Sequence, residues 1–217
     1  GTFTDIVAVG SSGEVRVHKL PSTPVNYGEA IVEGIGEVFS PGSGDKVKEV
    51  IHGTTVATNA ILSGTGALTG LITTKGFRDV LEIGRLRMPR LYDLTWEKPE
   101  PLVPRYLRME VDERIAADGT VEKALDEGSV AAAIDRLKAE GVESVAVCLL
   151  NSYVNAEHER ILGERLREAG EWTVSLSYEI LPEIREYERT STTVVNAYVL
   201  PVVQTYLSGL QVELNRL

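Results

Sequence analysis

Two short stretches of this sequence place glycine and threonine beside a group that can bind a metal ion or move a proton. The first is the run Gly1, Thr2, Phe3, Thr4 and Asp5. The glycine lets a phosphate approach the backbone, and the threonine hydroxyls and backbone N–H groups can donate to its oxygens. The carboxylate one step further on can hold Mg²⁺ through water. Taken alone, five residues favour a simpler structural interpretation, in which threonine only stabilises a strand.

The second stretch begins with His52, Gly53, Thr54 and Thr55 and continues through Asn59. Glycine at a strand end, followed by two threonines that open a helix, is the layout of a helix N-terminus that binds an anion. The imidazole of His52 can donate to an oxyanion or move a proton, and the Asn59 amide can hydrogen-bond a ligand amide. The structural alternative is a helix that Thr54 or Thr55 caps, beside a histidine that only packs.

Two charged clusters are further candidates. Arg85, Arg87 and Arg90 stand close together in an acidic sequence. They can clamp a carboxylate or a phosphate, although such a run is more often a solvated loop. Acidic and basic side chains are also dense over 183–189, directly before the hydroxyl-rich run 190–193. That density predicts an ion-pair network near the start of a helix.

The elements that position these side chains are those of an α/β protein. Alternating residues over 4–9 and 14–20 predict a hairpin around a Gly/Ser turn, and its abrupt start leads us to expect an earlier strand. Because both glycine-threonine stretches end strands, we expect them to meet at one cleft. The other elements expected in the first half are a helix over 25–40, a strand over 47–51, a helix over 56–62, a strand over 67–73 and a short helix over 76–83.

The second half alternates helices and strands, which predicts a parallel or mixed sheet. Ser129 is expected to cap a helix that stops at Gly141, and the apolar run 145–150 predicts a strand buried on both faces. The proline-rich stretch 86–105 is the expected boundary between two parts of the chain. The remaining elements expected are a helix capped by Asn155, a strand over 172–176 and a long helix over 190–217 that contains Pro201.

The composition excludes several classes of protein. The 22 basic and 32 acidic residues give a net charge of −10, so a nucleic-acid partner is not expected. No apolar run reaches the roughly 20 residues that span a bilayer, so we expect no membrane partner. The lone cysteine, Cys148, lies in an apolar run and fits a buried thiol in a reducing, cytoplasmic location. The three histidines lie too far apart in sequence to suggest a zinc site.

Four stretches together resemble one family, the N-terminal domain of hydantoinase A and 5-oxoprolinase, and the resemblance extends throughout the chain. They are residues 52–62, 71–85, 145–153 and 185–198. The resemblance implies a mixed-sheet α/β fold of the actin, sugar-kinase and heat-shock-chaperone ATPase superfamily.

That family opens with an Asp, two glycines and Thr-Phe-Thr-Asp, and Gly1 to Asp5 match the tail of this signature. We therefore expect the first strand before Gly1 and a second nucleotide-binding half after Leu217. The domain organisation implied is a phosphate-loop hairpin with strand-helix units over 1–85, a proline-rich connection over 86–105 and an α/β continuation over 106–217.

The resemblance also implies ATP and Mg²⁺ as cofactors. The residues implied are Gly1, Thr2, Thr4, Gly53, Thr54 and Thr55 for the nucleotide, His52 and Asp5 for catalysis, Asp5 for the metal, and Asn59 and Arg85 for the substrate.

The activity implied is ATP-dependent hydrolysis of a cyclic amide such as 5-oxoproline or a hydantoin. Phosphoryl transfer to the amide oxygen creates a reactive imidate phosphate, which water then opens. The alternatives are a subunit of an acetone- or acetophenone-type carboxylase and a non-catalytic scaffold that binds a partner. The partners expected are the cyclic amide, a subunit or domain of hydantoinase B type, and further copies of the chain. Without the second half, the chain alone is expected to be inactive.

Overall fold

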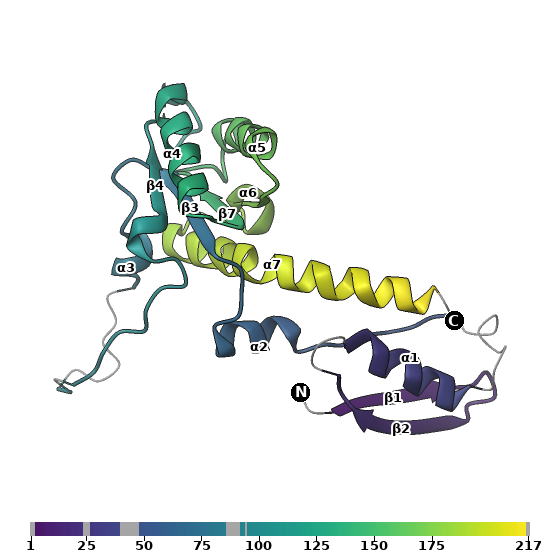
Figure 1. Cartoon of the computed structure of the whole chain (residues 1–217). Helices are drawn as coiled ribbons and strands as arrows, with labels where there is room; N and C mark the ends of the chain where they lie inside the picture. Colours follow the sequence, from purple (N-terminus) through teal and green to yellow (C-terminus); the bar gives the residue numbers. More distant parts are fainter. Residues whose placement is uncertain (1–2, 24–26, 40–47, 86–91, 94, 216–217) are drawn as a thin grey trace. The chain divides into compact units, whose positions relative to one another are not determined.

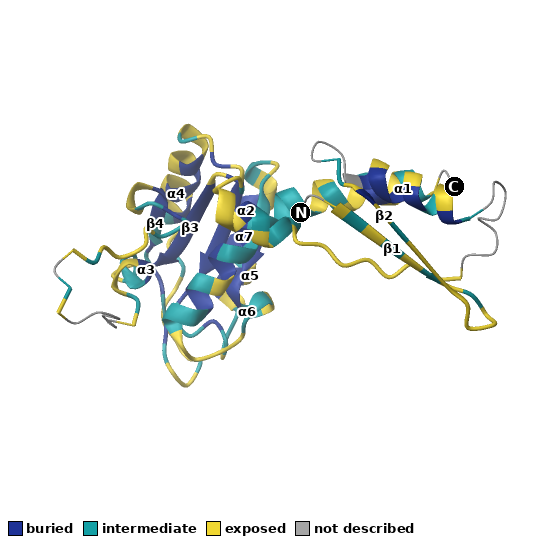
Figure 2. Ribbon diagram, turned by 90° about the horizontal axis from the view of Figure 1, so that it is seen from below, coloured by how far each residue is buried: buried dark blue, intermediate teal, exposed yellow. Residues whose placement is uncertain are grey.

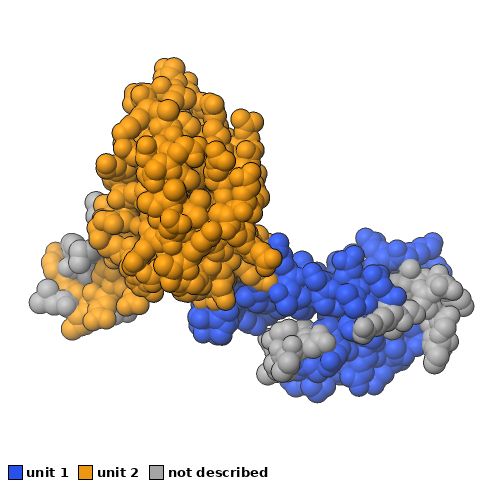
Figure 3. Space-filling view, turned by 45° about the horizontal axis from the view of Figure 1, so that its top comes forward, with its two compact units in different colours: residues 1–65, 202–217 blue, residues 66–201 orange. Residues whose placement is uncertain are grey.

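The computed structural model describes residues 3–23, 27–39, 48–85, 92–93 and 95–215. The chain divides into two compact units (Figure 3). Unit 1 comprises residues 1–65 and 202–217, and unit 2 comprises residues 66–201. The predicted connection over 86–105 lies within unit 2 and partly outside the described residues. A further division of the chain at that stretch stays a prediction.

Unit 1 contains the predicted hairpin (Figure 1). β1 (Phe3–Val9) pairs antiparallel with β2 (Val15–Pro21), and α1 (Tyr27–Val38) packs against one face of the pair. Gly34 allows this approach, since a Cβ there would collide with the side chains of Ile6 and Leu20. The hairpin and the first helix are therefore where the apolar pattern predicts them.

The opposite face of the hairpin stays open to solvent within the part of the chain that the structure describes. Its large apolar side chains are between 56% and 71% exposed, and Figure 2 shows the alternation of exposed and half-buried residues along β1. These side chains are Phe3, Val7, Val9, Val15 and Val17.

The strand predicted over 47–51 is wrong for residues 48–51, which are irregular, while Val47 lies outside the described residues. Val50 is 48% and Ile51 is 88% exposed. Their apolar pattern suggested a strand, but no neighbouring strand among the described residues pairs with them. The helix that follows, α2 (Val56–Ser63), is confirmed and ends at the left-handed Gly64.

The core of unit 2 is a four-stranded sheet in the order β4-β3-β7-β8, in which all the pairings are parallel. Every residue of β3 and β7 is buried, as expected for central strands that are covered on both faces. The strands are β3 (Thr69–Thr74), β4 (Arg108–Val111), β7 (Ser144–Cys148) and β8 (Thr173–Leu176).

Helices cover both faces of this sheet (Figures 1 and 2). On one face Leu137 fills the space beside Gly70, and Leu176 packs close to Gly163. On the other face the Asn196 amide of the long last helix donates to a serine hydroxyl of β8 at 2.9 Å. The helices are α4 (Glu127–Ala139) and α5 (Glu157–Ala169) on the first face, and the first part of α7 (Glu186–Leu214) on the second.

The helix caps differ in part from the predicted ones. Ser129 does not cap α4, because the helix begins earlier and the Asp126 carboxylate accepts a hydrogen bond from the Ser129 N–H at 2.7 Å. Asn155 is not the N-cap of α5, which is Ala156, but its side-chain oxygen accepts from the Glu157 N–H beside the helix start at 3.0 Å. Gly141 follows α4 in the left-handed region, with φ of 69°, and confirms the predicted stop.

The remaining elements of unit 2 are short. The helix predicted over 76–83 is reduced to its last turn, because Gly76 adopts a φ of 92° in the turn after β3. The short elements are α3 (Val80–Ile83), η2 (Arg105–Leu107), β5 (Arg114–Ile115), β6 (Val121–Lys123) and α6 (Ser177–Ile180).

The last helix, α7, begins at Glu186, before the predicted start, and contains Pro201.

Candidate functional site

The first candidate stretch lies at the start of β1. Gly1 and Thr2 are outside the described residues, so the structure gives no position for them. The Thr4 hydroxyl hydrogen-bonds the Ser22 hydroxyl at 2.9 Å. Successive side chains of a strand point to opposite faces, so Thr4 and Asp5 diverge. A ligand that uses both groups has to reach around the start of the strand.

Asp5 lies on the open face of the hairpin, where its carboxylate pairs with Lys19 at 3.1 Å. Its side chain is more than half exposed, so water or a metal ion can displace the lysine at little cost. An exposed carboxylate that reaches Mg²⁺ through water fits this position. No group of three or more His, Cys, Asp or Glu side chains within the described residues can hold a metal by itself.

The second candidate stretch precedes α2, and His52, Gly53, Thr54 and Thr55 are all exposed. The hydroxyl of Thr54 accepts from the backbone N–H of Val56 at 3.2 Å, which satisfies one donor at the helix start. A Cβ on Gly53 would meet open space. The start of α2 is therefore open to an anion, although the Thr54 hydroxyl also has the local role that a structural interpretation requires.

Asn59 lies one turn into α2, where its side-chain amide donates to the Thr55 hydroxyl at 3.2 Å. One of its amide hydrogens is therefore engaged within the helix, while its carbonyl oxygen forms no hydrogen bond among the described residues. The side chain keeps an acceptor for a ligand N–H.

His52 contacts a residue that the sequence did not single out. Its Nε2 hydrogen-bonds the hydroxyl of Tyr206, and the two ring centroids lie 5.6 Å apart. Partial burial lowers the pKa of His52 below its ordinary value, so the imidazole is neutral near pH 7. Because the two residues are far apart in the sequence, no local pattern could have joined them.

Arg85 forms an ion pair with Glu188 of α7. Arg87 and Arg90, which the sequence groups with it, lie outside the described residues. Lys98 adds a second cation nearby, since its ammonium donates to the carbonyl oxygen of Ile83 at 3.1 Å. Arg85 is thus tied to a carboxylate of its own protein and is free for a ligand only if that pair opens.

The structure does not bring the two candidate stretches together through a direct bond. Among the described residues, no hydrogen bond or ion pair joins Thr4 or Asp5 to the segment 52–55. Their convergence on one cleft stays a prediction.

Sequence reasoning missed a buried polar network at the carboxyl ends of the central strands. The Glu159 carboxylate accepts from the N–H of Leu149 at 2.7 Å, the hydroxyl of Ser177 at 2.6 Å and the N–H of Tyr178 at 3.1 Å. Burial raises the pKa of Glu159 above its ordinary value, and these hydrogen bonds oppose that rise.

A second buried carboxylate, Glu113, extends the network. It accepts from the hydroxyl of Thr74 and lies 2.7 Å from Nδ1 of His158. Glu113 follows the end of β4, and Glu159 lies in the first turn of α5. The signal that could have revealed both acids is positional, because residues after parallel strands and residues at the start of the helices that follow gather at the carboxyl edge of the sheet.

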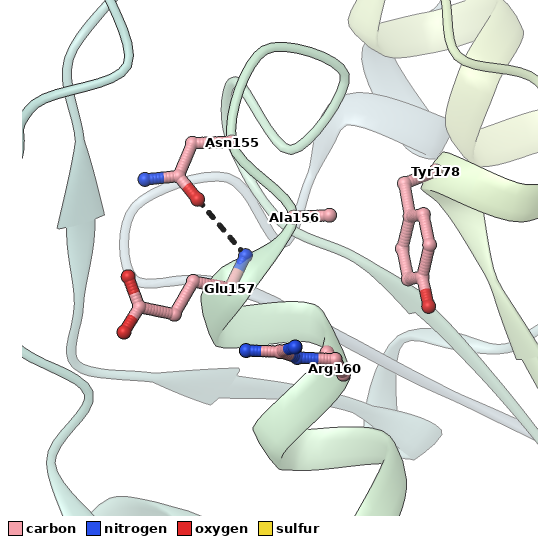
Figure 4. Close-up of a pocket in the computed structure, with 5 residues that line it drawn as sticks. All are labelled: Asn155, Ala156, Glu157, Arg160 and Tyr178. Carbon is pink, nitrogen blue, oxygen red and sulfur yellow. Dashed lines mark hydrogen bonds between the residues drawn. The ribbon is translucent and has the colours of Figure 1, made fainter.

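An open hollow of about 380 Å³ lies at the start of α5 (Figure 4). Its lining combines the acidic Glu157 with the basic Arg160, and the phenol ring of Tyr178 forms one side. The mixed charges and the wide opening identify no particular ligand.

Residues 1–170 match the family described as the hydantoinase/oxoprolinase N-terminal region. The chain belongs to this family. The alpha subunit of caprolactamase from Pseudomonas jessenii is 39% identical over 217 residues, which cover 95% of this chain and 31% of that protein. 5-Oxoprolinase 1 of Arabidopsis thaliana is 35% identical over 241 residues, which cover 96% of this chain and 19% of that protein.

Two solved structures share the fold of the chain. The ATP-dependent caprolactamase from Pseudomonas jessenii gives a TM-score of 0.87 at 37% identity, over 99% of this chain and 33% of that one. Nucleotide-free acetone carboxylase gives a TM-score of 0.85 at 26% identity, over 99% of this chain and 33% of that one. The α/β, actin-like fold class is thus confirmed, and this family member spans a third or less of the length of these relatives.

No helix of the described residues is long and apolar enough to cross a membrane.

Proposed function

We propose that this protein forms the N-terminal region of an ATP-dependent enzyme that opens a cyclic amide through a phosphorylated intermediate. The observation that carries the proposal is the similarity of nearly the whole chain to proteins named for caprolactam and 5-oxoproline. Both compounds are lactams, and an amide carbonyl needs activation before water attacks it at neutral pH.

The candidate residues supply hydrogen-bond donors, a carboxylate and a neutral base. ATP provides the phosphoryl group when it is bound. The Thr4 hydroxyl and the exposed backbone before α2 would donate to phosphate oxygens, and Asp5 would hold Mg²⁺ through water. The neutral His52 accepts a proton at Nε2, where it now contacts the hydroxyl of Tyr206.

Two further residues are proposed to bind the substrate. The carbonyl oxygen of Asn59 accepts from the N–H of the cyclic amide. Arg85 binds a substrate carboxylate, such as that of 5-oxoproline, after it exchanges Glu188 for the ligand.

The test is ATP turnover by the full-length protein with 5-oxoproline, caprolactam or a hydantoin, with product formation measured beside ADP release. Replacing Thr4 by Val removes the hydroxyl and is expected to reduce turnover at least tenfold. Ser22→Ala is the matched control, because it removes the partner of Thr4 and leaves the Thr4 hydroxyl in place. Equal losses in both variants, or no ATP turnover with any cyclic amide, contradict the proposal.

A second candidate is a subunit of an ATP-dependent carboxylase, which the structural similarity to acetone carboxylase favours. In the same assay, ATP turnover that requires acetone or acetophenone together with bicarbonate selects this candidate. A full-length protein that binds no ATP selects the non-catalytic scaffold instead. In either catalytic case we propose a partner subunit or domain of hydantoinase B type.

A further inference from the structure

The order of the strands in unit 2 reverses direction between β3 and β7. The chain passes from β3 to its neighbour β4 on one side, and then from β7 to β8 on the other side. In open α/β sheets, ligands collect beyond the carboxyl ends of the strands at the point where the order reverses. The topology therefore favours a ligand site beside the segments that follow Thr74 and Cys148.

A small cavity lies at this point, between the ends of β3 and β7 and the first turn of α7. Its volume is about 10 Å³, close to the space that one water molecule or one ligand oxygen needs. Thr73, Cys148, Arg189 and Thr190 are buried and form its polar wall. None of these residues belongs to the proposed nucleotide site.

Arg189 is only 1% exposed, and its guanidinium is incompletely hydrogen-bonded. Its Nη1 donates to the carbonyl of Glu183 at 2.7 Å, and its Nη2 donates to the carbonyl of Leu149 at 2.9 Å. Its third donor, Nε, is buried and has no hydrogen-bond partner among the described residues. A buried donor without an acceptor costs free energy, so this nitrogen points to an acceptor from outside the chain.

Arg189 also lacks a carboxylate partner among the residues that the structure describes. Arg108, which is also buried, forms ion pairs with Glu82 at 2.9 Å and Asp79 at 3.9 Å, although its Nη1 has no hydrogen bond. Within the described part of the chain, no carboxylate lies within ion-pair distance of Arg189, and the face of Tyr153 lies 5.3 Å from its guanidinium carbon. A buried guanidinium that is paired only with carbonyls and a ring has no direct counter-ion.

We propose that this cavity receives one carboxylate oxygen of a small monocarboxylate, which accepts a hydrogen bond from Nε of Arg189. A carboxylate supplies both the missing acceptor and the missing negative charge. Phe77 and Val80 at the rim suit a short apolar group on the ligand, whereas Glu186, also at the rim, repels a phosphate or a second carboxylate. This site requires no nucleotide and does not depend on the proposed catalytic activity.

The test uses sodium formate, the smallest carboxylate, as the probe. The protein is titrated in the absence of ATP. Titration is expected to shift the ¹⁵N–¹H resonance of Arg189 Nε saturably and to raise the melting temperature. Sodium chloride at equal ionic strength is expected to produce neither change. Val80→Trp should close the rim without altering Arg189 and should weaken formate binding at least tenfold. Val154→Trp, on an exposed loop, is the matched control and should bind formate normally.

Arg189→Lys keeps the charge and removes Nε. Because the side chain is buried, this substitution can itself impair folding of the variant. Val80→Trp therefore decides the question. A crystal structure that shows only a water molecule in the cavity at saturating formate overturns the proposal. Formate binding that Val80→Trp leaves unchanged overturns it as well, because the ligand would then lie elsewhere.

Discussion

The backbone N–H of Leu149 donates to the buried carboxylate of Glu159 at 2.7 Å, which joins the residue after β7 to the first turn of α5. The same carboxylate accepts from Ser177 and Tyr178, directly after β8. One acid therefore holds the ends of two neighbouring strands and the start of the helix that connects them.

Glu159→Ala is expected to destabilise the protein by about 2–4 kcal/mol, because it removes the acceptor of three donors at buried or partly buried positions and opens a cavity. Chemical denaturation followed by circular dichroism measures the change. Glu157→Ala, on the exposed side of the same helical turn, is the control and should cost less than about 1 kcal/mol. Similar losses in both variants would show that the network contributes little.

Stability should also depend on pH through this side chain. Burial raises the pKa of Glu159 above its ordinary value, so the folded state holds the proton more tightly than the unfolded state does. The contribution of Glu159 to stability is therefore greatest below the unfolded pKa and declines as pH rises through the folded pKa. On acidification toward the ordinary glutamate pKa of about 4.3, the wild type should gain stability relative to Glu159→Gln, as measured by denaturant midpoints.

Cys148 is buried, as its apolar surroundings predict, and burial raises the pKa of its thiol. Because the thiolate is the reactive form, we expect native protein to react with Ellman's reagent at least a hundredfold more slowly than protein unfolded in guanidinium chloride. Fast stoichiometric labelling under native conditions would contradict this expectation.

Gly66 lies against the ring of Tyr198, and a Cβ at this position would overlap the ring carbons. Tyr198 is buried and its carbonyl accepts from the Ala67 N–H at 3.0 Å, so neither side can move easily. Gly66→Ala is expected to cost about 1–3 kcal/mol through overpacking. Gly36→Ala in α1, where the Cβ meets open space, should be neutral or stabilising. Thermal unfolding of the two variants provides the comparison.

The Tyr206 hydroxyl contacts His52 at an exposed position, so Tyr206→Phe should change the melting temperature little. If His52 moves a proton in the full-length enzyme, loss of this orienting contact should lower kcat more than it changes KM. Tyr106→Phe is a control at another exposed tyrosine. A melting temperature that drops while kcat stays constant would assign the pair a structural role only.

Local patterns predicted the elements whose partners are near in the sequence. The hairpin, α2 and the buried strand β7 follow from alternation, the residues at helix ends and an uninterrupted apolar run. The strand predicted over 47–51 is wrong for residues 48–51, because apolar residues form a strand only where another strand pairs with them. The pairing of His52 with Tyr206 and the acceptors around Glu159 join distant segments, and only the folded chain reveals them.

The central position of β3 has a consequence for synthesis on the ribosome. Leu71 pairs with Arg108 on one side of the strand and with Ala146 on the other, so β3 lacks its second neighbour until β7 has emerged. At about 5–20 residues per second, synthesis of the chain between β4 and β7 takes several seconds. During that time Leu71 and Ile72 belong to an unfinished strand that can pair with another nascent chain. Translation that is slow between β4 and β7 should therefore increase the demand for chaperones.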